Sequence, residues 1–167
     1  MRKTFMFILL LGIISYAQEK NKQMIDEKSG KLILIGYCDR TAFADTNYSW
    51  WFNSEYDNYE YNASTVDSLK HELSNILIKI VMGSWCSDSR REVPRFYKLL
   101  DAIEYNYNNF TLISTDRKKE SPEGNISELE IKYVPTFIVY RNDKEIGRII
   151  ETPKISLEKD LLDIIRQ

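Results

Sequence analysis

Residues 76–94 read ILIKIVMGSWCSDSRREVP and decide the fold. The first seven of them are dense in Ile, Leu and Val, as expected for a strand that is buried on both faces of a sheet. Residues 83–86 end this strand, and from Asp88 onward apolar residues recur at steps of three and four, which predicts a long helix. A buried strand that leads through a short turn into a helix is typical of α/β proteins.

Strands and helices alternate outward from this stretch. Ser64 provides a hydroxyl cap and Asp67 follows three residues later, which is the form of a helix start. Helices between the early strands and a late hairpin indicate one α/β domain with a mixed sheet. Further strands are expected over residues 32–36, 110–114, 136–140 and 145–151, and further helices over residues 125–131 and after Ser156.

Two segments before residue 64 give weaker signals. Residues 18–31 are polar and are expected to be loose. Residues 41–62 are rich in Tyr, Trp and Phe, but no period can be assigned to them, so we expect an irregular segment with short helical pieces. The aromatic residues between Tyr48 and Tyr61 suit either a cover packed over the sheet, which is the preferred interpretation, or a lip that binds a partner.

Composition excludes several classes of protein. The 167 residues carry 23 Lys and Arg against 25 Asp and Glu, a net charge of −2, so no global basic field favours nucleic acid. One His and two Cys cannot supply the four ligands of a structural zinc cage. We therefore expect neither a metal nor a cofactor, and we expect a monomer.

The first 17 residues have the order of a secretory signal peptide. Arg2 and Lys3 precede the apolar run 5–14, and Ser15-Tyr16-Ala17 offers small residues for cleavage. The run is too short for a bilayer of about 30 Å, which requires about 20 apolar residues. We expect an exported, periplasmic protein with no membrane span after cleavage, made of an N-terminal extension (residues 18–63) and a core (residues 64–167).

Cys86 is the strongest candidate for a reactive residue in the sequence. It stands where a strand gives way to a helix, and unpaired backbone N–H groups at a helix start favour a thiolate. Arg90 and Arg91 add to this effect, whereas Asp88 opposes it. The alternative is that Cys86 is a small buried apolar residue, as free cysteines often are.

The sequence resembles the thioredoxin family over residues 64–167. Trp85-Cys86-Ser87-Asp88-Ser89 lies where that family carries its Trp-Cys-x-x-Cys site, Pro94 matches the proline that kinks the following helix, and Val134-Pro135-Thr136 matches the cis-proline loop. The aromatic segment and the sequence of residues 86–94 resemble those of secreted thioredoxin-like proteins of Bacteroidetes-type bacteria. The resemblance implies a thioredoxin-like three-layer sandwich, with a mixed central sheet between helices on both faces.

The resemblance also implies roles for individual residues. Cys86 is expected to be the nucleophile, with Ser89 beside it and Pro135 facing its sulfur. An extended substrate would pair with the backbone beside Cys86. The substrate contacts are expected to come from Trp85, Ser87, Asp88, Arg90 and Val134.

Two departures from the family pattern restrict the chemistry. Ser89 replaces the second cysteine, so the pair 86/89 cannot close its own disulfide and release a substrate. Ile80 occupies the position of the family's buried acid, for which Glu92 or Asp88 could substitute. What remains is disulfide isomerisation or mixed-disulfide chemistry by one thiol, on exported proteins or on small thiols and disulfides.

Two questions stay open at this point. A non-catalytic, chaperone-like binding module with the same groove is the alternative function. Cys38 is either a resolving cysteine or, as we prefer, a buried inert one.

Overall fold

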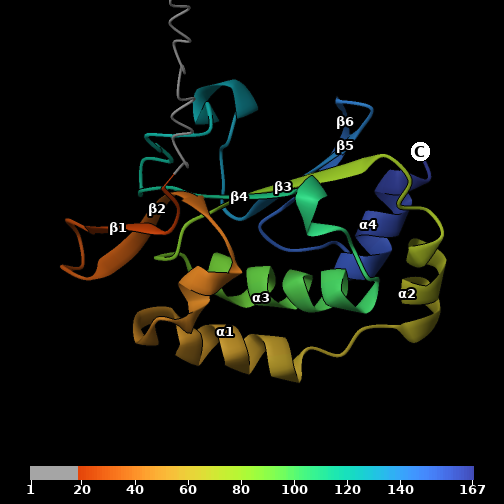
Figure 1. Cartoon of the computed structure of the whole chain (residues 1–167), viewed down its shortest axis with the longest axis horizontal. Helices are drawn as coiled ribbons and strands as arrows, with labels where there is room; N and C mark the ends of the chain where they lie inside the picture. Colours follow the sequence, from red (N-terminus) through yellow and green to blue (C-terminus); the bar gives the residue numbers. More distant parts are fainter. Residues whose placement is uncertain (1–18) are drawn as a thin grey trace, which may run out of the picture.

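The computed structural model describes residues 19–167 (Figure 1). The predicted signal peptide, residues 1–17, lies outside the described residues. Within residues 19–167, no helix has both the length and the apolar character that a bilayer crossing requires.

A six-stranded mixed sheet forms the centre, in the order β1-β2-β4-β3-β5-β6. β3 runs parallel to β4 and antiparallel to β5, and the remaining neighbours are antiparallel. This mixed sheet, with helical segments on both faces, confirms the predicted fold class. The strands are β1 (Lys22–Ile25), β2 (Leu32–Cys38), β3 (Ile76–Met82), β4 (Phe110–Ser114), β5 (Thr136–Arg141) and β6 (Lys144–Ile150).

The α-helices gather on one face of the sheet (Figure 1). The other face is covered by the segment that contains the short 3₁₀ helix η3, whose Ile126 is buried there. The helices are α1 (Thr46–Asn58), α2 (Ala63–Lys70), α3 (Ser87–Ala102) and α4 (Leu157–Ile165), with the 3₁₀ helices η1 (Arg40–Ala44), η2 (Tyr107–Asn109) and η3 (Ile126–Leu129).

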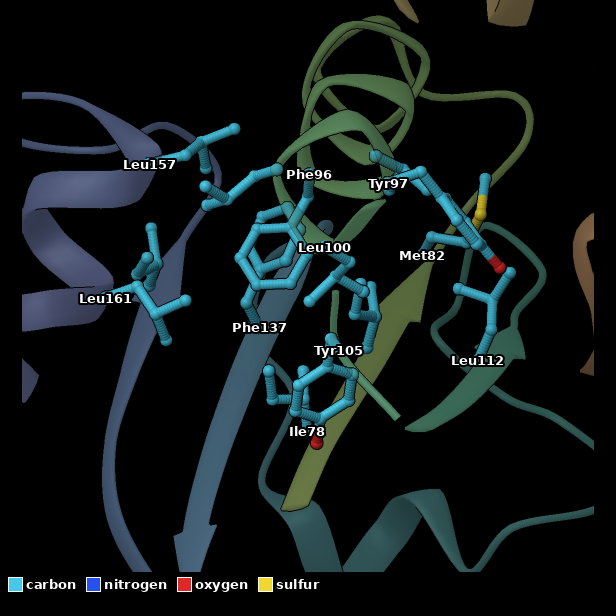
Figure 2. Packing of buried hydrophobic residues seen from close by; sticks show 14 of the residues in the cluster. Ile78, Met82, Phe96, Tyr97, Leu100, Tyr105, Leu112, Phe137, Leu157 and Leu161 are labelled. Atoms are coloured by element: carbon cyan, nitrogen blue, oxygen red, sulfur yellow. The ribbon is translucent and has the colours of Figure 1, made fainter. Parts of the chain in front are cut away.

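The alternation of β3 explains why the two faces differ. Ile78, Ile80 and Met82 point toward α3 and belong to the large core, whereas Val81 points to the opposite face. Figure 2 shows Phe96 of α3 against Phe137 of β5, with ring centroids 4.7 Å apart. Such a layer of close-packed apolar side chains is the main source of stability in a domain of this size.

Residues 41–62 contain a regular helix, which corrects the expectation of an irregular segment. Tyr48, Trp51 and Phe52 follow the i, i+3, i+4 spacing and are all buried. Trp50 is 65% exposed, and because this aromatic residue faces solvent, the helical spacing of the buried aromatic residues of α1 cannot be recognised from the sequence. The segment does act as a cover, but α1 packs on α3 rather than on the sheet (Figure 1).

Aromatic rings join this cover to α3. Phe43 stacks on Phe52 with centroids 4.4 Å apart, and both rings make T-shaped contacts with the ring of Tyr97. Edge and offset ring contacts of this kind contribute about 0.5–1.5 kcal/mol beyond the area that they bury.

Three smaller expectations need correction. Residues 22–25 of the polar stretch form β1, because their backbone pairs with β2 although their side chains show no alternation. Helix α2 is capped by Asn62, whose side chain accepts from Thr65 N–H, rather than by Ser64. The expected helix over residues 125–131 is only the 3₁₀ helix η3, since Asn125 and Glu130 at its ends adopt left-handed backbone angles.

Candidate active site

Cys86 is the N-cap of α3, as the sequence predicts. Its backbone is extended, and its carbonyl accepts the N–H of Arg90 at 3.1 Å. No side chain caps this helix end. The thiol is only partly buried, and it donates to the carbonyl oxygen of Val134 at 3.2 Å. The structure therefore places the sulfur at the open end of a helix and at the surface, not in the core.

The loop before β5 lies directly against this sulfur. The Val134–Pro135 peptide bond is cis, and both residues are buried. The register pairs Val81 of β3 with Thr136 of β5, which brings the loop to the end of β3 where the Cys86 turn begins. The Thr136 hydroxyl donates to the carbonyl oxygen of Tyr133 at 2.7 Å and fixes the start of the strand. Cys86 and the Val134–Pro135 loop, 48 residues apart in sequence, thus share one site.

Trp85 is held rigidly next to Cys86. Its Nε1–H donates to the carbonyl oxygen of Thr115 at 2.9 Å. The guanidinium of Arg117 lies over the indole ring, 4.9 Å from its centroid. Gly83 is required here, because a Cβ at this position would stand 2.6 Å from indole atoms of Trp85.

Arg117 and Asp26 form an ion pair that sequence analysis missed. Asp26 is only 4% exposed, and the Arg117 guanidinium donates to both of its oxygens at 2.8–3.0 Å. Hydrogen bonds from Arg117 and then from Ser29 hold the pKa of Asp26 well below its usual range. The same pairing with Asp26, and to a lesser extent the charge of Cys86, raises the pKa of Arg117. Arg117 therefore places a positive charge close to Trp85 and Cys86.

The remaining predicted site residues on α3 differ in what they do. Ser89 is fully buried, and its Oγ accepts the N–H of Gly83 at 3.1 Å, so it fixes the turn. Ser87 is exposed beside Cys86, and Asp88 pairs with Arg91 at 2.9 Å. Arg90 bends back toward the turn, where its Nε–H donates to the carbonyl oxygen of Ser84 at 2.6 Å.

Glu92 is engaged with cations. It is 3% exposed and pairs with Arg91 at 2.6 Å and with Arg95 at 3.8 Å. Ile80 is fully buried in the core, so it offers no acid to the site.

Cys38 is far less accessible than Cys86. It is buried in the core that faces α3, and its thiol donates to the carbonyl oxygen of Gly36 at 3.5 Å. Burial raises the pKa of the Cys38 thiol to about 12. Cys86 instead packs against the small buried cluster on the other face of the sheet, which consists of Val81, Ile113, Ile126 and Val134. Both cysteines are free, and this arrangement agrees with the interpretation of Cys38 as a buried inert residue.

Comparisons with known proteins identify two thioredoxins as relatives. No family model matches the chain. The putative thioredoxin-5 of Dictyostelium discoideum is 33% identical over 89 residues, which is 52% of this chain and 81% of that protein. Thioredoxin H2 of Arabidopsis thaliana is 31% identical over 88 residues, which is 53% of this chain and 62% of that protein.

A solved structure supports the fold over a longer part of the chain. It is a protein of unknown function from Pseudomonas aeruginosa, similar with a TM-score of 0.56 at 13% identity over 79% of this chain and 91% of the other. A likeness at this identity shows the fold alone. The identity to the Dictyostelium protein extends over most of that relative's length, and it is this similarity, joined to the arrangement around Cys86, that assigns the chain to the thioredoxin-like family.

Proposed function

We propose that this protein carries out thiol–disulfide exchange with Cys86 as its single nucleophile. The observation that carries the proposal is the position of the Cys86 sulfur, partly exposed at the start of α3 and 3.2 Å from the Val134 carbonyl. The thioredoxin names of two relatives support redox chemistry of this general kind.

The reaction is a displacement at sulfur. The Cys86 thiolate attacks one sulfur of a substrate disulfide, so that a new S–S bond forms while the substrate S–S bond breaks. The leaving sulfur takes the electron pair and then a proton from water. The product is a mixed disulfide between Cys86 and the substrate.

Release needs a thiol from elsewhere. Ser89 has no thiol, and the buried Cys38 lies on the other face of the sheet. A second thiol of the substrate, or a small external thiol, must therefore attack the mixed disulfide. Attack by the substrate's own thiol rearranges its disulfides with no net oxidation, which is isomerisation.

The surroundings of Cys86 suit a polypeptide substrate in extended form. The Val134 backbone lies beside the sulfur, and main-chain pairing at such a loop orients an added strand. Trp85 provides a fixed wall, and Ser87 and Asp88 border the sulfur at the start of the helix.

Trapping of mixed disulfides tests the proposal. Protein released from cells is quenched in acid, and adducts are separated without reductant. We expect adducts on the wild type and on Cys38→Ser, and none on Cys86→Ser. Adducts that persist in folded Cys86→Ser, or that are lost in folded Cys38→Ser, would contradict the proposal.

We also propose that residues 1–17 direct export, so that the substrates are exported proteins. The support is the charged, apolar and small-residue order of this segment. Fractionation of cells that produce the whole chain should find it outside the cytoplasm, with an N-terminus at residue 18. Retention of the whole chain in the cytoplasm would overturn this proposal.

A further inference from the structure

A cavity of about 480 Å³ adjoins Trp85 on the surface of the protein. It lies between the β1–β2 turn, the start of α1 and the turn before α3. Three of its lining residues are cations, and none is an acid. The lining consists of Ser29, Lys31, Leu32, Ile33, Thr46, Asn47, Tyr48, Trp50, Ser84, Trp85, Arg90 and Arg117.

The positive charge of this cavity is only partly neutralised. Among residues 19–167, no carboxylate lies within ion-pair distance of Lys31 or Arg90, whereas Arg117 is paired with Asp26. Arg90 uses Nε to hold the Ser84 carbonyl, which leaves the rest of its guanidinium for another acceptor. Asp45, next to the start of α1, does not line the cavity, and its carboxylate accepts from Asn47 and Gln23.

The cavity is adjacent to Cys86 in sequence and through the packing of Arg117 on Trp85. Ser84 and Trp85 line it, and Cys86 is the next residue. Arg117 lies on the Trp85 ring and interacts electrostatically with Cys86. The rim is apolar, because Trp50 is 65% exposed and Leu32 is 43% exposed.

We propose that this cavity binds carboxylate groups of the substrate and thereby makes Cys86 prefer acidic disulfides. Guanidinium and ammonium groups bind carboxylates through charge-assisted hydrogen bonds. A volume of this size is within the range of sites for small organic groups. The proposal rests on the proposed function, since it concerns the substrate of the same exchange reaction.

The bond changes are those of the exchange itself. The Cys86 thiolate forms a bond to one sulfur of the acidic disulfide, and the other sulfur leaves with the electron pair and takes a proton from water. The bound carboxylate keeps its charge throughout and only positions the disulfide.

Three small symmetrical disulfides of similar size test the preference. Dithiodipropionate carries two carboxylates, hydroxyethyl disulfide is neutral and cystamine carries two ammonium groups. Rate constants for adduct formation on Cys86 are measured in the Cys38→Ser background by mass spectrometry. We expect the order acidic, neutral, basic, with differences that shrink as salt is added.

A matched pair of charge reversals distinguishes the effect of charge in the cavity from the effect of the net charge of the protein. Lys31→Glu changes a cavity residue, and Lys28→Glu makes the same change of net charge at an exposed position outside the lining. We expect Lys31→Glu to lower the ratio of the acidic to the neutral rate about 3- to 10-fold. Lys28→Glu should leave this ratio unchanged.

The outcomes distinguish the two proposals. A ratio of one in the wild type for both the small disulfides and the Asp/Asn peptide pair, or equal loss in Lys31→Glu and Lys28→Glu, overturns the inference and leaves the exchange function intact. Failure of Cys86 to react with all three disulfides overturns the function itself. Peptide disulfides that differ by one Asp→Asn change form a second arm: discrimination by peptides alone assigns the carboxylate to a polypeptide, and discrimination by the small disulfides assigns it to a small molecule.

Discussion

The two faces of the sheet differ in the thickness of the apolar layer that covers them. The face toward α3 and α4 carries the large core, and Cys38 on this face is buried, which raises the pKa of its thiol to about 12. The opposite face carries only a small cluster of Val81, Ile113, Ile126 and Val134, against which Cys86 packs. A thin apolar layer keeps one sulfur near the surface, whereas a thick layer removes the other from solvent. The difference in burial predicts that Cys86, and not Cys38, is accessible to reagents in solvent.

The largest difference between the faces is expected in thiol reactivity. At pH 8 the native protein should be alkylated at Cys86 at least about 100-fold faster than at Cys38, because burial raises the Cys38 pKa to about 12 and shields its sulfur. Mass spectrometry of single-cysteine variants gives both rates. Similar rates in the folded protein would remove the contrast, and similar rates in urea are the control.

A second thiol at position 89 should increase the difference in redox activity between Cys86 and Cys38. Ser89 lies one helical turn after Cys86, and we expect Ser89→Cys to form a disulfide with it and to gain dithiol reduction of insulin. Loss of the Gly83 N–H to Ser89 Oγ bond should cost about 1 kcal/mol of unfolding free energy. Ser87→Cys, at an exposed position, is the matched control. A folded Ser89→Cys protein that reduces no insulin would show that the turn geometry is unsuitable.

A cavity in the large core that faces α3 should lower the stability of the protein and leave the reactivity of Cys86 unchanged. Phe96→Ala removes a fully buried ring that packs on Phe137, and it should lower the unfolding free energy by about 3–5 kcal/mol. Urea denaturation measures this loss. Below the transition, the alkylation rate of Cys86 should remain within about twofold of the wild type, and a larger change would mean that the two faces are coupled.

A smaller effect is expected from the Asp26–Arg117 pair. Because the folded pKa of Asp26 is depressed, the pair stabilises the fold at pH values above the carboxyl's unfolded pKa of about 4, and this contribution is lost as the pH falls through the folded value. Asp26→Asn should therefore be less stable than the wild type at pH 7, and the gap should narrow below pH 4. Urea midpoints measured across this range give the comparison, and a gap that does not depend on pH would contradict it.

Sequence analysis predicted the fold well where burial is regular. The bounds of β3 are those expected, because all its side chains are apolar except Lys79. Helix α4 begins after Ser156, as predicted, because its cap and its apolar spacing agree. Strand β1 was missed because backbone pairing with β2, not side-chain pattern, holds it in place.

Only part of the site could be predicted from the sequence. Cys86 was singled out by its place between a strand and a helix, and a family resemblance then added Val134 and Pro135 and fixed the positions of the three residues relative to one another. Arg117 and Asp26 are 91 residues apart, and neither stands in a motif, so no local pattern joins them. The cavity cations Lys31, Arg90 and Arg117 likewise come from three distant segments, and only the fold brings them together.

The fixed indole of Trp85 has one more consequence. With its N–H bound to the Thr115 carbonyl and its face covered by a guanidinium, the ring has little freedom to reorient when a ligand arrives. Its fluorescence should therefore change through direct contact with the incoming molecule, so the native protein carries its own optical reporter of occupancy. Trp51 is buried and Trp50 is exposed, and replacing each with Phe would isolate that signal.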